Sequence, residues 1–295
     1  MSGSRVVVVL GGDLDSRSST VADIIGDHGG TALVLTGHPG SVDRRLDTGD
    51  DGPVEVRPDD PAARLSSFVA GSVDADDEVL AALALGGDGV LASVLGWEYA
   101  RRAAAAQAWD LVVVELDGDL AGVRRIAAAG ELAAFVESRW PAHVRFASMA
   151  AGDRADARLR EAHRLSQLAS DVSAFLAGMV EVVVAGATPH RTAALADLVR
   201  GAVAPVVAED GHGGFRAELA VPAHPTTPVT VDGGRLRLEF DGVRAALPLP
   251  ALLARCTLVD STYDDHRGVV VVGFAPDPDL WPSHLVPAGS TRQPG

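Results

Sequence analysis

Four short runs of aliphatic residues, separated by longer stretches with helical character, constrain the fold of this chain more than any other feature. They occupy residues 6–10, 31–36, 110–116 and 180–185, and residues 6–10 read VVVVL. A strand without polar alternation is typical of a parallel sheet that is covered on both faces. The alternation of such strands with helices therefore predicts a doubly wound, mostly parallel α/β domain.

The stretches between these runs predict the helices that cover the sheet. Ser19 and Thr20 are expected to cap the helix at residues 21–28, and Gly29 and Gly30 to end it. Residues 40–60 are rich in Asp, Gly and Pro, which predicts an exposed loop with a short edge strand at 54–56. The further helices are expected at residues 61–71, 76–85, 88–108, 120–139, 153–178 and 191–203.

The pattern changes after Pro205, where short strand-like runs follow one another without helices. Two hairpin signals, Asp232-Gly233-Gly234 and Asp241-Gly242, separate some of them. This pattern predicts a small antiparallel β-sandwich. With the boundary near 207–213, we expect a first domain at 1–207, a sandwich at 208–282 and a polar tail at 283–295. The strands are expected at 215–221, 229–231, 235–240, 243–248, 257–263 and 269–274.

Charge and composition exclude several classes of function. The formal net charge is -15, and all 25 residues in the Lys+Arg count are arginines, so no lysine is available as a phosphate clamp. This charge disfavours nucleic acid as a partner. Cys256 is the only cysteine, which excludes an internal disulfide and a multi-cysteine zinc site. No run approaches about 18 uncharged apolar residues, so no membrane span is expected, and the protein is expected to be cytoplasmic.

Three segments resemble the ArsA-type anion-transporting ATPase family. They are VVVVLGGDLDSRSSTVADIIGDHGGTALVLTGHPGS at 6–41, WDLVVVELDGDLAGVRRI at 109–126, and RLEFDGVRAALPLPALLARCTLVDSTYDDHRGVVVVGFAPDPDLWP at 237–282. The first two stand where the family has its deviant P-loop, first switch and second switch. The third is similar to the small heat-shock-protein-like domain that ends actinobacterial members. The resemblance implies a P-loop NTPase-type domain, ATP with Mg²⁺ as cofactor, and a nucleotide site at a dimer interface.

The P-loop segment departs from the family pattern, GKGGVGKTT, at most positions. When the alignment is anchored on Thr20 and the two residues after it, Gly12 matches a glycine and Ser19 keeps the hydroxyl that binds Mg²⁺. Among the positions that differ, Asp13 stands at the signature Lys, Asp15 and Arg17 replace glycines, and Ser18 stands at the Walker Lys. A P-loop needs glycines for the approach of backbone N–H groups to phosphate and a Lys for charge. The segment is therefore expected to repel a triphosphate.

The two switch segments are also altered. His38, in GHPGS, stands near the family's TDPAHS, so the carboxylate that positions water is missing there. Glu115 matches the Asp of the second switch, and Asp117-Gly118-Asp119 replaces Ala-Pro-Thr. Phosphoryl transfer needs a cradle, a metal and a water-positioning group together, so one retained acid does not restore catalysis. No catalytic residue is assigned.

Acidic residues at the ends of strands leave a second interpretation open. Converging carboxylates bind hard cations such as Ca²⁺ or Mg²⁺, but acids at these places also cap helices. Either interpretation applies to the same side chains, and no metal site is assigned. The candidates are Asp13, Asp15, Glu115, Asp117 and Asp119.

The function expected from these features is that of an inactive ArsA-like pseudo-ATPase. It would have no cofactor and would act as a protein-interaction or regulatory subunit, paired with an active homologue or with itself. One alternative is an ATPase or nucleotide sensor in which Arg17 takes the role of the Walker Lys and ATP with Mg²⁺ is bound. The other alternative is a cation or small-molecule binding module at the acidic strand ends.

Overall fold

The computed structural model divides into two compact units, Met1–Ala196 and Asp197–Gly295, which are considered separately. This division lies N-terminal to the boundary expected near 207–213. The expected helix at 76–85 and tail at 283–295 lie outside the described residues. The structure describes residues 4–11, 13–46, 53–71, 89–118, 120–150, 152, 156–186, 190–201, 203–211, 213–221, 225–232, 234–240 and 243–281.

The first unit contains a five-stranded sheet in which every neighbouring pair is parallel, in the order β3-β2-β4-β1-β5. Except for Arg5, all residues of β1, β2 and β4 are buried. The parallel α/β architecture expected from the sequence is therefore confirmed. The strands are β1 (Arg5–Leu10), β2 (Ala32–Thr36), β3 (Val54–Pro58), β4 (Leu111–Glu115) and β5 (Val180–Val184).

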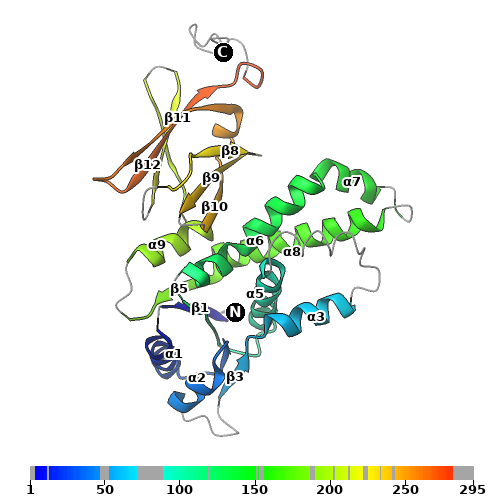
Figure 1. Cartoon of the computed structure of the whole chain (residues 1–295), viewed down its shortest axis with the longest axis vertical. Helices are drawn as coiled ribbons and strands as arrows, with labels where there is room; N and C mark the ends of the chain where they lie inside the picture. Colours follow the sequence, from blue (N-terminus) through cyan, green and yellow to red (C-terminus); the bar gives the residue numbers. More distant parts are fainter. Residues whose placement is uncertain are drawn as a thin grey trace. The chain divides into compact units, whose positions relative to one another are not determined.

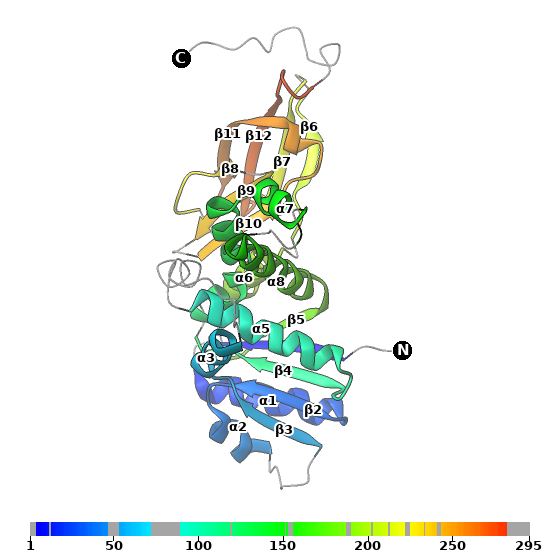
Figure 2. The same ribbon diagram turned by 90° about the vertical axis from the view of Figure 1, so that its right-hand side faces the viewer.

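Helices cover both faces of this sheet. Helices α1 and α2 lie on one face, whereas α5, α6 and α8 lie on the other (Figures 1 and 2). Val7 and Val9 of β1 pack with Val21 and Ile25 of α1 in one buried cluster. None of the described helices is long and apolar enough to cross a bilayer. The helices are α1 (Leu14–His28), α2 (Pro39–Leu46), α3 (Pro61–Gly71), α5 (Val90–Ala105), α6 (Leu120–Arg139), α7 (Ala142–Ala150), α8 (Ala157–Met179) and α9 (His190–Val199).

The connections that leave β1 and β4, which are neighbours in the sheet, run in opposite directions across it. From β1 the chain crosses β4 to reach β2, whereas from β4 it crosses β1 to reach β5. Since both crossovers are right-handed, the two connections lie on opposite faces of the sheet. Ligands of open α/β sheets bind in the crevice that such a change of direction leaves at the carboxyl ends of the strands. The residues that follow β1 and β4 therefore define the first place to look for a site.

Helix α1 begins seven residues earlier than the sequence predicted. It starts at Leu14, and Asp13 is its N-cap, because the Asp13 carboxylate accepts a 2.7 Å hydrogen bond from the Ser16 amide. The prediction that Ser19 or Thr20 caps this helix was wrong, since both residues lie within it. Gly29 ends the helix as expected, with a φ of 68°.

Replacing Asp13 with alanine is expected to lower the melting temperature of the protein, because the amide of Ser16 loses its acceptor. The hydrogen bonds from Ser16 lower the pKa of Asp13 below its ordinary value. This stabilisation is therefore present above the ordinary Asp pKa and is lost as the pH falls through the lowered pKa. Asp15→Ala is the matched control, and thermal melts of both variants between acid and neutral pH measure the difference.

Three elements lie where the sequence analysis expected none. Helix α2 occupies part of the expected loop at 40–60, because Val42 and Leu46, one helical turn apart, pack against the core. Helix α7 follows Pro141, whose carbonyl accepts hydrogen bonds from the amides of Val144 and Arg145. Strand β6 (Val206–Glu209) pairs with a strand of the second unit.

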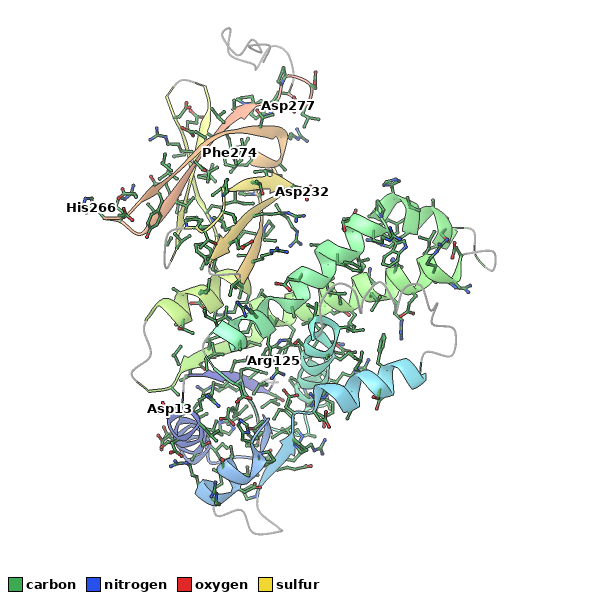
Figure 3. All side chains as sticks on the ribbon, in the orientation of Figure 1. Asp13, Arg125, Asp232, His266, Phe274 and Asp277 are labelled. Atoms are coloured by element: carbon green, nitrogen blue, oxygen red, sulfur yellow. The ribbon has the colours of Figure 1, made fainter. Side chains whose placement is uncertain are left out.

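The second unit contains two antiparallel sheets, of order β10-β9-β8 and β11-β12-β7-β6. Buried residues alternate with exposed or half-buried ones along β9 and with half-buried ones along β12, as expected for sheets that each bury one face. In Figure 3, Phe274 lies among the strands, whereas His266 and Asp277 lie at the periphery. The other strands are β7 (Phe215–Ala220), β8 (Thr230–Asp232), β9 (Arg235–Phe240), β10 (Val243–Pro248), β11 (Cys256–Asp264) and β12 (Val269–Pro276).

Candidate functional site

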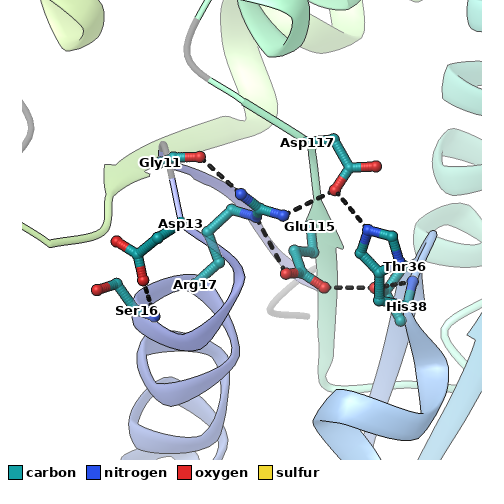
Figure 4. A network of polar contacts seen from close by, with 8 residues as sticks. All are labelled: Gly11, Asp13, Ser16, Arg17, Thr36, His38, Glu115 and Asp117. Atoms are coloured by element: carbon teal, nitrogen blue, oxygen red, sulfur yellow. Dashed lines mark hydrogen bonds and ion pairs between the residues drawn. The ribbon is translucent and has the colours of Figure 1, made fainter.

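A buried arginine lies at the carboxyl ends of β1 and β4, where the strand order predicts a crevice (Figure 4). Arg17 of α1 donates from Nε to Glu115 Oε1 at 3.1 Å, from Nη1 to the Gly11 carbonyl at 2.8 Å, and from Nη2 to Asp117 Oδ1 at 2.7 Å. The side chains of Arg17 and Glu115 are only 4% and 1% exposed. Each nitrogen of the guanidinium thus has an acceptor within the protein.

The phase of α1 directs Arg17 toward the sheet. Arg17, Val21 and Ile25 are spaced by four residues, so they lie on one face of the helix, and all three are buried. Gly11 leaves room for the Arg17 side chain, because a Cβ at Gly11 would lie 3.2 Å from Arg17 Cγ and 3.0 Å from the Ala185 carbonyl oxygen. A larger residue at position 11 would displace the arginine.

The network extends to β2 and the turn after it. The Thr36 hydroxyl donates to Glu115 Oε2, and the same hydroxyl accepts a 2.9 Å hydrogen bond from the His38 amide. His38 Nε2 lies 3.2 Å from Asp117 Oδ1. Of the residues that the sequence singled out, the structure therefore brings together Arg17, His38, Glu115 and Asp117. Thr36 was not among the predicted site residues, although its place at the end of a buried strand put it at this edge of the sheet.

The connection between β1 and α1 is too short for a phosphate-binding loop of the P-loop type. Strand β1 ends at Leu10 and α1 begins at Leu14, whereas that motif has four residues between its two glycines alone. Ser18, Ser19 and Thr20 lie within α1, where amide groups donate to carbonyls four residues earlier. These amides are therefore not available to a ligand, and Gly12 lies outside the described residues.

Ser18, which the alignment placed at the Walker Lys, is fully buried, and its hydroxyl has no hydrogen-bond partner among the described residues. Ser19 and Thr20 are half-buried on the next positions of α1. The three side chains are thus parts of a helix that packs on the sheet.

The acidic candidates do not converge on one point. Asp13 caps α1, and Asp15 forms an exposed ion pair with Arg45 at 3.0 Å. Glu115 and Asp117 instead share the guanidinium of Arg17. The remaining candidate, Asp119, lies outside the described residues. In the described part of the chain, no group of three or more His, Cys, Asp or Glu residues is placed to hold a metal ion.

The electrostatics of the crevice follow from these contacts. One guanidinium faces two carboxylates, so the fixed charges of Arg17, Glu115 and Asp117 sum to a net negative value at neutral pH. A phosphate group that approached this place would meet carboxylates at its surface, because Asp117 is 55% exposed whereas Arg17 is buried beneath it. The positive charge of Arg17 is thus already shared by two carboxylates, and three of its N–H groups donate to protein acceptors.

Comparison with known proteins gives no family assignment. No protein-family model matches the sequence, and no curated protein matches it at a significant level.

Proposed function

We propose that this protein is an inactive, ArsA-like pseudo-ATPase that acts as a protein-interaction or regulatory subunit, with an active homologue or a second copy of itself as partner. The single observation that carries the proposal is the place of Arg17. Its guanidinium lies between the carboxyl ends of β1 and β4 and donates to Glu115, Asp117 and the Gly11 carbonyl. The support from family resemblance is confined to the three sequence segments and the parallel α/β fold.

Arg17 also weighs against a nucleotide sensor with an altered phosphate cradle. The Arg17 side chain is only 4% exposed, so it would have to turn away from Glu115 to reach a phosphate, and the buried Glu115 would lose its charged partner. Separating the partners of a buried ion pair costs about 3–5 kcal/mol, which a weakly bound ligand does not recover.

An exposed apolar patch on α7 supports the interaction role. Its members, Phe146 and Met149, are 57% and 39% exposed, and they lie three residues apart on one face of the helix. Exposed large apolar side chains that gather on one helix are typical of surfaces that bind another protein. We refer to these two residues as the α7 patch.

The first test is the response of the melting temperature to nucleotide. A ligand present at about 100 times its Kd stabilises a protein by about 2.7 kcal/mol, which is readily detected. Millimolar Mg–ATP is expected to stabilise the protein no more than inorganic phosphate does at the same ionic strength. A shift that exceeds the phosphate shift by several degrees would contradict the proposal.

The second test concerns the α7 patch. The double variant Phe146→Ser/Met149→Ser is expected to lose the partner protein that co-purifies with the wild-type chain from its native host, while its melting temperature stays unchanged. Val259→Ser is the control, because Val259 is 65% exposed on β11 of the other unit. Retention of the same partner by the double variant would argue against this surface.

A further inference from the structure

A second cluster of charged side chains lies beside the Arg17 site, at the carboxyl end of β3. Asp59 directly follows β3, and its side chain is only 3% exposed. Both of its carboxylate oxygens accept hydrogen bonds from arginines, one from Arg64 of α3 and the other from Arg125 of α6. The Asp59 amide donates to the Thr36 carbonyl at 2.7 Å, so this cluster and the Arg17 network meet at Thr36.

A third arginine and an aromatic ring complete the cluster. Arg57 donates to Glu55 and to the Tyr99 hydroxyl, and the Arg64 guanidinium lies 4.9 Å from the centre of the Tyr99 ring. We call Arg57, Arg64 and Arg125 the arginine cluster. Its three positive charges face two carboxylates, so the cluster has a net charge of one positive unit in a chain whose formal charge is -15. The Arg17 site has the opposite sign.

Several guanidinium donors of the cluster have no acceptor among the described residues. Arg64 uses only Nη1 and Arg125 only Nη2 to bond Asp59. Arg125 Nε is buried without a hydrogen-bond partner, and the two side chains remain 17% and 24% exposed. A buried donor without an acceptor is costly, so it calls for an acceptor from water or from a ligand. Figure 3 shows Arg125 on the side of the sheet that α6 covers.

The chemistry of these donors suits an oxyanion such as phosphate. Guanidinium groups present paired N–H donors that match phosphate oxygens, and charge-assisted bonds of this kind are stronger than neutral ones. Because hydrogen bonds to Asp59 already hold the Arg64 and Arg125 side chains in place, these side chains lose little conformational freedom when an anion binds. The cluster also lies at the carboxyl edge of the parallel sheet, where ligands of such folds bind.

We propose that the arginine cluster binds a phosphate group, next to the crevice that Arg17 closes. The group is either inorganic phosphate or the phosphoryl group of a larger molecule. The proposal does not depend on the pseudo-ATPase role, because no residue of the cluster belongs to the Arg17 network.

The chain contains a matched control for this proposal. Glu98 of α5 also shares its carboxylate between two arginines, Arg101 and Arg102. These two arginines come from a single helix, and Arg102 is 75% exposed, so they form no enclosed set of donors. Arg102→Gln therefore removes one arginine from a similar triad where no phosphate is expected to bind.

The experiment is a calorimetric titration of the full chain with inorganic phosphate at low chloride and constant ionic strength. Binding is expected in the millimolar range for the wild type and for Arg102→Gln. Arg125→Gln is expected to raise the Kd about tenfold or more, as for the loss of one charge-assisted hydrogen bond. Arg64→Gln provides a second variant with the same expected result, and thermal melts show whether each variant is folded.

NMR spectra of the wild-type protein provide a second measurement, which needs no variant. The NMR signals of the Nε–H groups of Arg64 and Arg125 are expected to shift on addition of phosphate, whereas that of Arg102 does not. The proposal is overturned if these signals stay in place, if folded Arg125→Gln or Arg64→Gln binds as tightly as the wild type, or if Arg102→Gln weakens binding equally.

A parallel titration with Mg–ATP distinguishes the sources of the phosphate group. Tighter binding of ATP than of phosphate would contradict the pseudo-ATPase proposal, and its loss in Arg125→Gln would assign a nucleotide phosphoryl group to the arginine cluster. If ATP binding survived Arg125→Gln, ATP would bind elsewhere, and the titration with inorganic phosphate would decide whether the cluster binds phosphate.

Discussion

Replacing Arg17 with methionine is expected to destabilise the protein by about 3–5 kcal/mol, because it leaves a buried carboxylate without its charged partner. Glu115 is 1% exposed, and beyond Arg17 its described hydrogen-bond partner is the Thr36 hydroxyl. The Gly11 carbonyl and Asp117 lose donors as well. Urea denaturation followed by circular dichroism measures the change in the free energy of unfolding.

Two further variants show whether the loss of stability comes from breaking the buried ion pair or from removing any arginine. Arg45→Met removes an exposed partner of Asp15, and such pairs contribute no more than about 1 kcal/mol. The double variant Arg17→Met/Glu115→Gln is expected to recover much of the loss, since no unpaired buried charge remains. If Arg17→Met were as stable as Arg45→Met, the hydrogen bonds and ion pairs of Arg17 would not stabilise the protein as described.

The second large effect is expected for Asp59→Asn, which should cost about 3 kcal/mol because Arg64 and Arg125 lose a shared counter-ion. Burial alone would raise the pKa of Asp59, but the charge and hydrogen bonds of Arg125 and those of Arg64 outweigh burial and lower this pKa below its ordinary value. The contribution of Asp59 to stability is therefore fully present above its ordinary pKa and is lost as the pH falls through the lowered pKa.

Denaturation curves of wild type and Asp59→Asn from neutral to acid pH test this effect. The difference in the free energy of unfolding should be largest near neutrality and should shrink in the acid range. Asp60→Asn is the control, because exposed Asp60 accepts one hydrogen bond from the Ala63 amide as a helix cap, so its loss should be smaller. A pH-independent difference would show that the charge of Asp59 is not what stabilises this region.

The parallel sheet could be predicted from the sequence because its strands carry a strong local signal. Residues 6–10, 32–36 and 111–115 are aliphatic runs without polar alternation, and all of them form buried central strands. Helix α2 was missed because its polar sequence, PGSVDRRL, reads as a turn and only Val42 within it is fully buried. Tertiary packing of that one residue and Leu46 against the core outweighs the weak local propensity.

The start of α1 was missed for a different reason. The alignment to a P-loop treated residues 13–20 as a loop, although two local signals in the sequence favour a helix there. Asp13 lies three residues before Ser16, as an N-cap does, and Arg17, Val21 and Ile25 follow one another at intervals of four. The helix boundary could thus have been predicted from the residues themselves.

The contacts of the site could not have been predicted from local patterns. Arg17 and Glu115 are separated by 98 residues, and Asp59 and Arg125 by 66. Their proximity depends on the order of the strands, in which β4 lies beside β1 although β2 and β3 come between them in the sequence. The sequence did indicate the edge of the sheet at which these residues gather, because each lies at the end of a strand, directly after one, or in the first two turns of a helix.

The most direct test of the central claim is a crystal structure of the protein grown with millimolar Mg–ATP. We expect the guanidinium of Arg17 to remain bonded to Glu115, Asp117 and the Gly11 carbonyl, with no nucleotide in contact with residues 11–20. A triphosphate seated against these residues, with Arg17 turned away from Glu115 and onto a phosphate, would contradict the account.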